Sequence, residues 1–262
     1  GNKLTRYWNR NLITDRVVRP AVSGANGIYD LSSQQAYKSE DVWPYSGDGL
    51  TTDGLAVHLD AGDSSSYSGT GTTWYDLTSN DIDMTIFNGA TYSSSDGGYF
   101  HFDGSNDYAQ YEGSDWTNFG TNPFAVEIWS NFDQAHNGGL AASAQSAGTS
   151  WAVQLRNNRK LSFRPPTKTC QTLLSANTWG QYVFVREGTG TNEAVHYING
   201  FPAGTETYAT NLSSTAGLRI GRNRANVYFD GKISIVRIYR NRSLSREEVL
   251  GNFVSNRDRY SI

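Results

Sequence analysis

Hydrophobic and polar residues alternate along most of the chain after residue 50, as is typical of β-strands with one buried face. Each short run is bounded by Gly, Asn, Asp or Pro, a spacing common in β-sandwiches. In FAVEIWSNF, we expect Phe124, Val126 and Ile128 to share one face, with Glu127 and Trp129 on the other. Further strands are predicted at LAVHLD, MTIFNG, YFHFDG, YAQYEG, WAVQLR, KLSFR, QYVFVRE, AVHYING, GLRIGR and KISIVRIY.

The chain ends with a strand followed by a short helix. Residues 233–239 place apolar side chains on both parities, which predicts a strand covered on both faces. Ser245 and Glu248 have the spacing of a capping box, and Leu244 and Val249 that of a hydrophobic staple. We therefore expect a helix that folds back to plug the end of a sheet. Between strands, the Asn-Gly pair of YING indicates a tight hairpin.

Composition supports one β-rich domain. The 262 residues include 27 glycines, 13% aromatic and 18% charged residues, a mixture that favours strands and turns. A single cysteine, Cys170, excludes an internal disulfide, and no Cys/His group has zinc spacing. No apolar run is long enough to span a membrane. We expect an arm at residues 1–49 and one domain at residues 50–262.

Charge is unevenly distributed along the sequence. Residues 39–155 hold sixteen acids and no Lys or Arg, whereas residues 156–262 hold sixteen Lys or Arg and seven acids. The larger acidic block argues against a nucleic-acid partner. Two interpretations stay open: strands of the two blocks neutralise each other in one sandwich, or an acidic surface binds cations or a basic neighbour.

The first 49 residues lack a sustained hydrophobic period. An isolated arm cannot bury its own aromatic side chains, so it should lie against its own domain or a partner. The residues expected to contact a partner are Tyr7, Trp8, Tyr37 and Trp43.

A dozen ordered segments carry a resemblance to a known family. FAVEIWSNF, WAVQL, KLSF, LLSANTWGQYVFVREG, VHYINGFPAG, LRIGRN and FDGKISIVRIYRNRSLSREEVL resemble the laminin G-like modules of the concanavalin A-like jelly-roll superfamily. With the segments that precede them, they cover residues 50–255. The resemblance implies an all-β jelly-roll sandwich of two antiparallel sheets, with the extended N-terminal arm and the short C-terminal helix as additions.

The N-terminal segment carries a second resemblance, and the penultimate strand departs from the family pattern. The segment GIYDLSSQQAYKSEDVWPY resembles leaders of virion structural proteins of tailed phages, particularly marine phages and cyanophages. Related modules often carry one or two acidic residues just after the isoleucine of the penultimate strand. This chain has Ser234 and Ile235 there, so the polar contact of those acids is expected to be missing.

Carbohydrate binding needs exposed aromatic rings beside hydrogen-bonding loops, because a sugar ring has an apolar face and a polar edge. Trp74, Tyr75, Trp116 and Trp151 lie in or beside segments rich in Gly, Ser, Thr and Asn. The alternative for each ring is packing in the core. These four residues are our candidate ligand-binding positions.

The resemblance also implies calcium as the most common ion, although no cofactor is required for the fold. Asp103, Asn106 and Asp107 of DGSND could supply oxygen ligands from one loop. The alternative is that these side chains satisfy the backbone of their own turn. The four histidines are scattered without a ligand pattern.

Some proteins of this fold are glycoside hydrolases, which need two carboxylates about 5–10 Å apart. Glu127 and Asp133 share a face of one strand but would lie roughly 20 Å apart. We therefore expect no catalytic residues and no enzymatic activity, with Glu127 exposed or in a salt bridge.

The function favoured by these observations is that of a phage virion structural protein, located in the virion. It would be a capsid decoration or a tail or head appendage, a tail fibre for example, in several copies or as a homo-oligomer. The arm would bind other virion proteins, and the domain could aid host attachment through a cell-surface glycan. Two alternatives stay open, a free lectin-type carbohydrate-binding module and a glycoside hydrolase.

Overall fold

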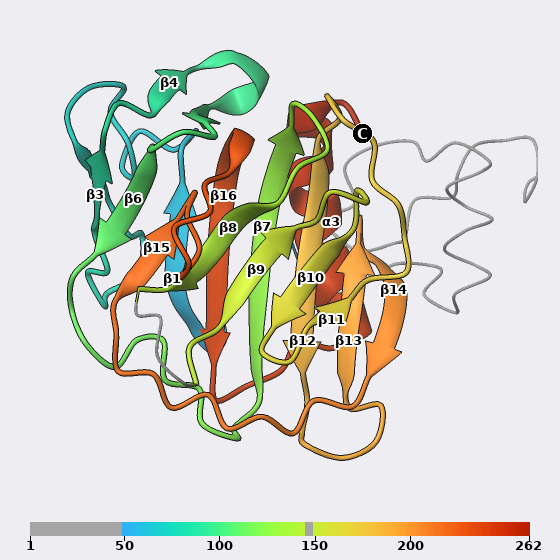
Figure 1. The fold of residues 1–262 in the computed structure, drawn as a ribbon. Helices are drawn as coiled ribbons and strands as arrows, with labels where there is room; N and C mark the ends of the chain where they lie inside the picture. Colours follow the sequence, from blue (N-terminus) through green and yellow to red (C-terminus); the bar gives the residue numbers. More distant parts are fainter. Residues whose placement is uncertain (1–48, 145–148) are drawn as a thin grey trace, which may run out of the picture.

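The alternating runs of the sequence form the strands of two antiparallel β-sheets that pack face to face (Figure 1). This computed structural model describes residues 49–144 and 149–262. The predicted all-β sandwich with a short C-terminal helix is confirmed. The predicted arm, including Tyr7, Trp8, Tyr37 and Trp43, lies outside the described residues, apart from residue 49.

The first sheet has the strand order β14-β13-β12-β7-β16-β5-β4, and β1 also pairs with β16. β1 and β5 share one edge of the long strand β16, since β5 pairs with its beginning and β1 with its end. The strands are β1 (Leu55–Asp60), β4 (Thr91–Ser93), β5 (Tyr99–Asp103), β7 (Phe124–Phe132), β12 (Gly180–Arg186), β13 (Ala194–Ile198), β14 (Phe201–Glu206) and β16 (Asp230–Arg240).

The second sheet has the order β11-β10-β9-β8-β15-β6-β3-β2 and lies in front of the first in Figure 1. Its strands are β2 (Thr73–Trp74), β3 (Met84–Phe87), β6 (Tyr108–Tyr111), β8 (Gly138–Ser143), β9 (Ala152–Leu155), β10 (Leu161–Arg164), β11 (Lys168–Thr169) and β15 (Leu218–Ile220). Two 3₁₀ turns, η1 (Ser95–Gly97) and η2 (Asp258–Tyr260), complete the described elements with helix α3 (Arg246–Arg257).

The core lies between the inner faces of the sheets. Phe124, Val126 and Ile128 of β7 face this core, as the alternation predicts, and Trp129 faces the opposite side. Aromatic rings join the two layers: Phe163 of β10 stacks on a phenylalanine of β12 with ring centroids 4.2 Å apart. Such buried aromatic pairs dominate the packing energy of a sandwich core.

Strand β16 is covered on both faces, as predicted. A β-bulge in its pairing with β7, between Ile233 and Ile235, changes the parity. Ile233 and Val236 therefore both face the core, although three positions separate them, and Ile235 faces outward beneath the helix.

Helix α3 provides the outer cover. Ser245 caps its first turn, and the reciprocal capping box with Glu248 is present. Leu244 and Val249, the predicted staple, belong to one buried cluster with residues of β7, β12 and β16. The helix lies across the outer face of the first sheet (Figure 1) and does not plug its end, so the prediction was wrong on this point.

Strand β8 was not predicted, although it lies in the middle of the second sheet. Its sequence, GGLAAS, lacks the β-branched and aromatic residues that mark a strand. Small residues are needed here because another segment packs directly on the strand: a Cβ at Gly139 would lie 2.2 Å from the backbone nitrogen of Asn223. Close packing on β8 therefore hides the strand from sequence patterns.

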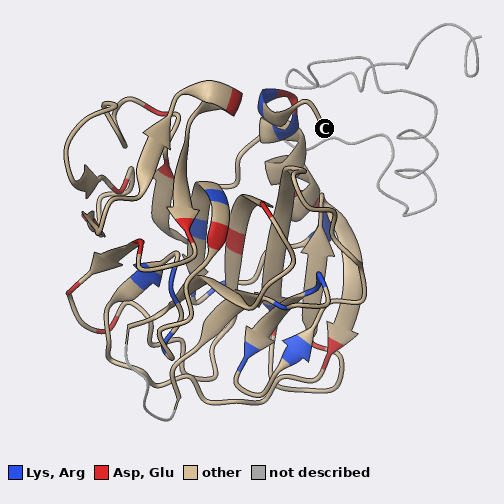
Figure 2. Cartoon of the chain, turned by 45° about the horizontal axis from the view of Figure 1, so that its top comes forward, with Lys and Arg blue, Asp and Glu red and all other residues tan. Residues whose placement is uncertain are grey.

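Ion pairs join the acidic and basic blocks of the sequence within one domain. Arg237 pairs with Glu127, and Arg259 pairs with Asp60. Figure 2 shows acidic and basic positions next to each other on the central strands. This supports the interpretation that strands from the two blocks interleave and neutralise each other.

Ser234, which stands where related modules carry an acid, makes polar contacts of its own. Its hydroxyl accepts from Tyr260 Oη at 2.7 Å and from Arg259 Nη2 at 3.0 Å. Arg259 also pairs with Asp60 of the adjacent strand β1. Ser234 thus has polar contacts of its own at this position, and the expected absence of the acid's contact stays a prediction. Among the described helices, none is long and apolar enough to cross a membrane.

Candidate functional site

Two of the four predicted aromatic platforms lie in the core. Trp151 stacks with Phe163, and its indole Nε1 donates to the carbonyl of Thr117 at 3.1 Å. Trp74 packs against Phe100 with ring centroids 4.9 Å apart. The structure corrects the prediction for both rings: each is 0% exposed, so neither can present a face to a ligand.

The other two rings reach the surface. Tyr75 is 49% exposed. Trp116 is partly buried against the core, and the guanidinium of Arg240 lies 5.0 Å from its ring centroid. Neither ring lines the hollows described below, so their role in ligand binding stays a prediction.

The predicted metal loop, residues 103–107, connects β5 of the first sheet to β6 of the second. Asp103 Oδ1 accepts from the Ser105 amide at 2.8 Å, and this bond lowers the pKa of Asp103. Asp107 is buried, which raises its pKa, and its carboxylate accepts from the Asp103 amide at 3.3 Å. Asn106 is exposed, and its carbonyl accepts from Asn88. The two carboxylates thus serve their own turn.

Glu127, the residue considered for glycoside hydrolysis, is sealed beneath α3. Its carboxylate is 0% exposed and accepts from Arg237 Nη1, Trp129 Nε1 and Gln181 Nε2, each at 3.0 Å. Asn252 of α3 donates to the second carboxylate oxygen at 2.8 Å. The predicted salt bridge is confirmed, and Glu127 holds the helix to the sheet.

An open hollow of about 490 Å³ lies where three loops meet beside the first residue of β16. Polar side chains dominate its lining, and Tyr228 provides an aromatic ring. The lining residues are Asp103, Gly104, Gln134, His136, Asn137, Asn226, Val227, Tyr228 and Asp230. We call this hollow the polar groove.

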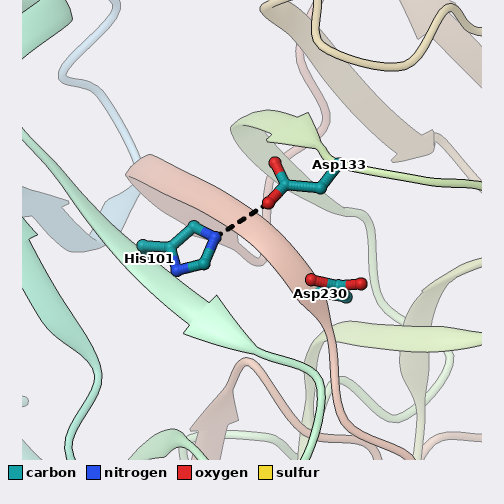
Figure 3. A group of neighbouring side chains, drawn as sticks. All are labelled: His101, Asp133 and Asp230. Carbon is teal, nitrogen blue, oxygen red and sulfur yellow. Dashed lines mark hydrogen bonds and ion pairs between the residues drawn. The ribbon is translucent and has the colours of Figure 1, made fainter.

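A histidine and two carboxylates converge next to the polar groove (Figure 3). His101 belongs to β5, Asp133 follows β7, and Asp230 begins β16. Their ligand atoms all lie within 4.8 Å of one another, and His101 Nε2 lies 2.9 Å from Asp133 Oδ2. We call these three residues the His–Asp–Asp cluster. Within residues 49–144 and 149–262, these are the three neighbouring His, Cys, Asp or Glu side chains that could hold a metal ion together.

Neighbouring side chains orient this cluster. Gln134 Nε2 donates to Asp230 Oδ2 at 2.9 Å. His136 Nε2 accepts from the Asp230 amide at 2.9 Å, so its other ring nitrogen, Nδ1, carries the proton and donates to the Gln134 carbonyl at 2.8 Å. The loop after β7 therefore fixes both the backbone amide and the carboxylate of Asp230.

A second hollow of about 220 Å³ opens near the loop before β12. Trp179, Leu173, Leu174 and Tyr182 contribute apolar lining, and Ser175 and Thr178 add hydroxyl groups. The Gln181 amide in its lining is already engaged, since it donates to Glu127 and accepts from the Gly200 amide, and Asn199 Oδ1 accepts from the Gln181 backbone. This hollow is smaller than the polar groove, and apolar side chains make up more of its lining.

Sequence reasoning missed the His–Asp–Asp cluster. His101 and Asp133 fall on the outward parity of predicted strands, and Asp230 precedes another strand, so each residue taken alone is ordinary. Only the pairing of β16 with both β5 and β7 brings them together. The parity was readable from the sequence, but the strand order was not.

Solved structures with a similar fold include a sialidase, a domain of an arabinanase and the binding domain of a mosquitocidal protein. A sialidase from Trypanosoma rangeli in complex with sialic acid matches at a TM-score of 0.62 and 16% identity, over 87% of this chain and 38% of the sialidase chain. Domain 4 of AbnA, a GH43 extracellular arabinanase from Geobacillus stearothermophilus, in complex with arabinotriose, matches at 0.55 and 16%, over 75% of this chain and 96% of that one. The binding domain of Paraclostridial Mosquitocidal Protein 1 matches at 0.57 and 16%, over 76% and 51% of the two chains.

These findings contradict the expectation that the chain is not an enzyme, because the matching structures include sialidases and a domain of an arabinanase. That expectation is withdrawn. The chain spans less than two fifths of the length of the sialidases it matches. At these identities, the likeness establishes the fold.

The sequence profile of one superfamily matches residues 103–250, which is more than half of the chain. The match runs from the end of β5 into α3 and includes the loops after β7 and before β16 that line the polar groove. No curated protein matches the chain. The two-sheet architecture agrees with the match, and the chain belongs to the concanavalin A-like lectin/glucanases superfamily.

Proposed function

We propose that this domain binds a carbohydrate in the polar groove. The observation that carries the proposal is an open hollow of about 490 Å³ lined by amide and carboxylate side chains and one tyrosine. Binding pockets combine a shaped surface with a few polar groups that set the orientation of the ligand. A lectin/glucanase fold and a matched arabinanase domain in complex with arabinotriose support the same class of ligand.

The groups of the polar groove suit a sugar ring. Tyr228 can cover the apolar face of the sugar ring, and the guanidinium of Arg222 lies 5.3 Å from the Tyr228 ring centroid, where it helps to hold the tyrosine in place. Arg222 also donates to Asn226 Oδ1, and the amide nitrogen of this groove-lining residue could donate to a sugar hydroxyl. Asp103 and Asp230 add carboxylate acceptors.

Calorimetric titration of the full chain with arabinotriose, a sialylated trisaccharide and a panel of polysaccharide fragments tests this proposal. Tyr228→Ala should weaken binding of the responding sugar by about tenfold or more, since aromatic anchors dominate such sites. Leu173→Ala is the matched control, because it removes an exposed apolar side chain that lines the second hollow and not the polar groove. Equal affinities of the two variants would refute the groove as the site.

The proposal also concerns the kind of protein or particle that carries this domain, called its carrier below. Since the matching structures include whole sialidases and one arabinanase domain, we place the domain with glycosidases, where it would bring a catalytic domain to its polysaccharide. Release of reducing sugar by the full chain, measured on the polysaccharide that binds most tightly, tests whether this chain itself carries the activity.

A phage particle is the second carrier, favoured by the resemblance of residues 1–45 to virion leaders. The arm would attach the domain to other virion proteins, and many copies would raise the avidity of a weak sugar site. Deleting residues 1–45 should abolish incorporation into particles and leave the domain folded. Incorporation of the truncated chain at a normal copy number would refute the role of the arm.

A further inference from the structure

We propose that the His–Asp–Asp cluster, His101, Asp133 and Asp230, binds a divalent transition-metal ion of the zinc class. The cluster presents one imidazole nitrogen and two carboxylates from three neighbouring strands of the first sheet. These side chains are partly buried and lie beside the polar groove, which Asp230 also lines. The proposal is independent of sugar binding, since it concerns the metal ion alone.

The spacing of the donor atoms already approaches that of metal ligands. Two ligands about 2.1 Å from one zinc ion lie about 3.0–3.4 Å apart when they occupy neighbouring positions. His101 Nε2 and Asp133 Oδ2 are 2.9 Å apart, and all three donors lie within 4.8 Å of one another.

Strand pairing holds the three residues in place. Asp230 and Asp103 are register partners between β16 and β5, and the Asp133 amide donates to the Asp230 carbonyl at 3.3 Å. Gln134 and His136 fix Asp230 by the hydrogen bonds described above. Metal-ligating side chains generally depend on such outer partners for their orientation.

Among residues 49–144 and 149–262, no Lys or Arg forms a salt bridge with either carboxylate of the cluster. In the described part of the chain, the ion pair of this cluster is that of His101 with Asp133. Lys232 is the register partner of His101, but its ammonium lies 5.2 Å from the ring centroid of Tyr99 and pairs with neither carboxylate. A cation between Asp133 and Asp230 would remove their mutual repulsion.

The donor set selects among cations. Calcium and magnesium prefer oxygen ligands, whereas imidazole favours zinc and related transition metals. One imidazole and two carboxylates leave further positions of the ion for water or a ligand from the polar groove, as in sites where zinc keeps an open position. The cluster therefore differs in chemistry from the all-oxygen calcium loop expected at residues 103–107.

Titration of the chelator-treated full chain with ZnCl₂, followed by calorimetry, tests the proposal. The expected result is one zinc ion per chain, with affinity reduced at least tenfold in His101→Asn and in Asp230→Asn. Asp81→Asn is the matched control, because this exposed carboxylate lies outside both the cluster and the polar groove. It should keep the affinity of the original protein.

A second measurement uses Co²⁺ as a spectroscopic probe, with circular dichroism to confirm that each variant is folded. Visible absorption bands of bound Co²⁺ should appear in the original protein and in Asp81→Asn and be absent from His101→Asn. Zinc binding that is equal in all variants, or absent from the folded original protein, would overturn the proposal, whatever the result with sugars.

Discussion

Replacing Glu127 with glutamine keeps the shape of the side chain but removes the charge that holds helix α3 to the first sheet. One carboxylate oxygen accepts three hydrogen bonds, including that of Arg237, and the other accepts from Asn252 Nδ2 at 2.8 Å. In Glu127→Gln, an amide NH₂ would face the NH₂ of Asn252. Asn252 cannot turn over to relieve this, because its Oδ1 accepts from the Thr51 amide and its Nδ2 also donates to Tyr239.

The magnitude follows from burial. The side chains of Glu127 and Arg237 are 0% and 2% exposed, so an unpaired Arg237 could be hydrated only if the helix opened. Removing one partner of a buried pair costs about 3–5 kcal/mol of unfolding free energy. For a domain of about 150–250 residues, each kcal/mol lowers Tm by about 2–4 °C, so we expect a fall of about 10 °C.

Urea unfolding, followed by tryptophan fluorescence and circular dichroism, measures this loss. Glu206→Gln is the matched control, since Glu206 pairs with Lys168 at 3.2 Å but both side chains are about one quarter exposed. A pair that reaches solvent contributes about 1 kcal/mol or less. Equal losses in the two variants would refute the argument that the Glu127 network anchors the helix.

Two further predictions concern the core and strand β8. His196 is buried in the core, where burial lowers its pKa from 6.5 to about 4. Because the unfolded chain binds the proton first, the contribution of His196 is present above pH 6.5 and is lost as the pH falls toward 4, by up to about 3 kcal/mol. Urea midpoints of His196→Phe should therefore depend less on pH in this window than those of the original protein, and an unchanged dependence would contradict the prediction. Gly139→Ala would place its Cβ 2.2 Å from the backbone nitrogen of Asn223 and should cost about 1–3 kcal/mol in the same assay; full stability would show that this loop yields easily.

Local patterns predicted most of the sandwich. The alternation in β7 assigned its faces correctly, and the capping box at Ser245 located the start of α3. The hairpin at Asn199 and Gly200 has positive φ at both residues, as the Asn-Gly signal requires. These features depend on neighbours close in sequence, so the sequence contains the information needed to predict them.

The candidate site was not predictable in the same way. Trp74 and Tyr75 are adjacent in the sequence, yet Trp74, at the end of β2, is fully buried and Tyr75, just after the strand, is half exposed. The local pattern does not say which of the two the second sheet buries. The turn chemistry of Asp103 and Asp107 resembled a calcium loop, since carboxylates that bind an ion and those that bind backbone amides look alike in sequence.

The sequence by itself determined the periodicity, the turns, the helix cap and the family to which the chain belongs. Tertiary structure alone decided that β16 lies between β7 and β5 along its first half, and this order brings His101, Asp133 and Asp230 together beside the polar groove. The physical reason is that strand alternation follows from local chemistry, whereas the order of strands depends on contacts between residues that are distant in the chain.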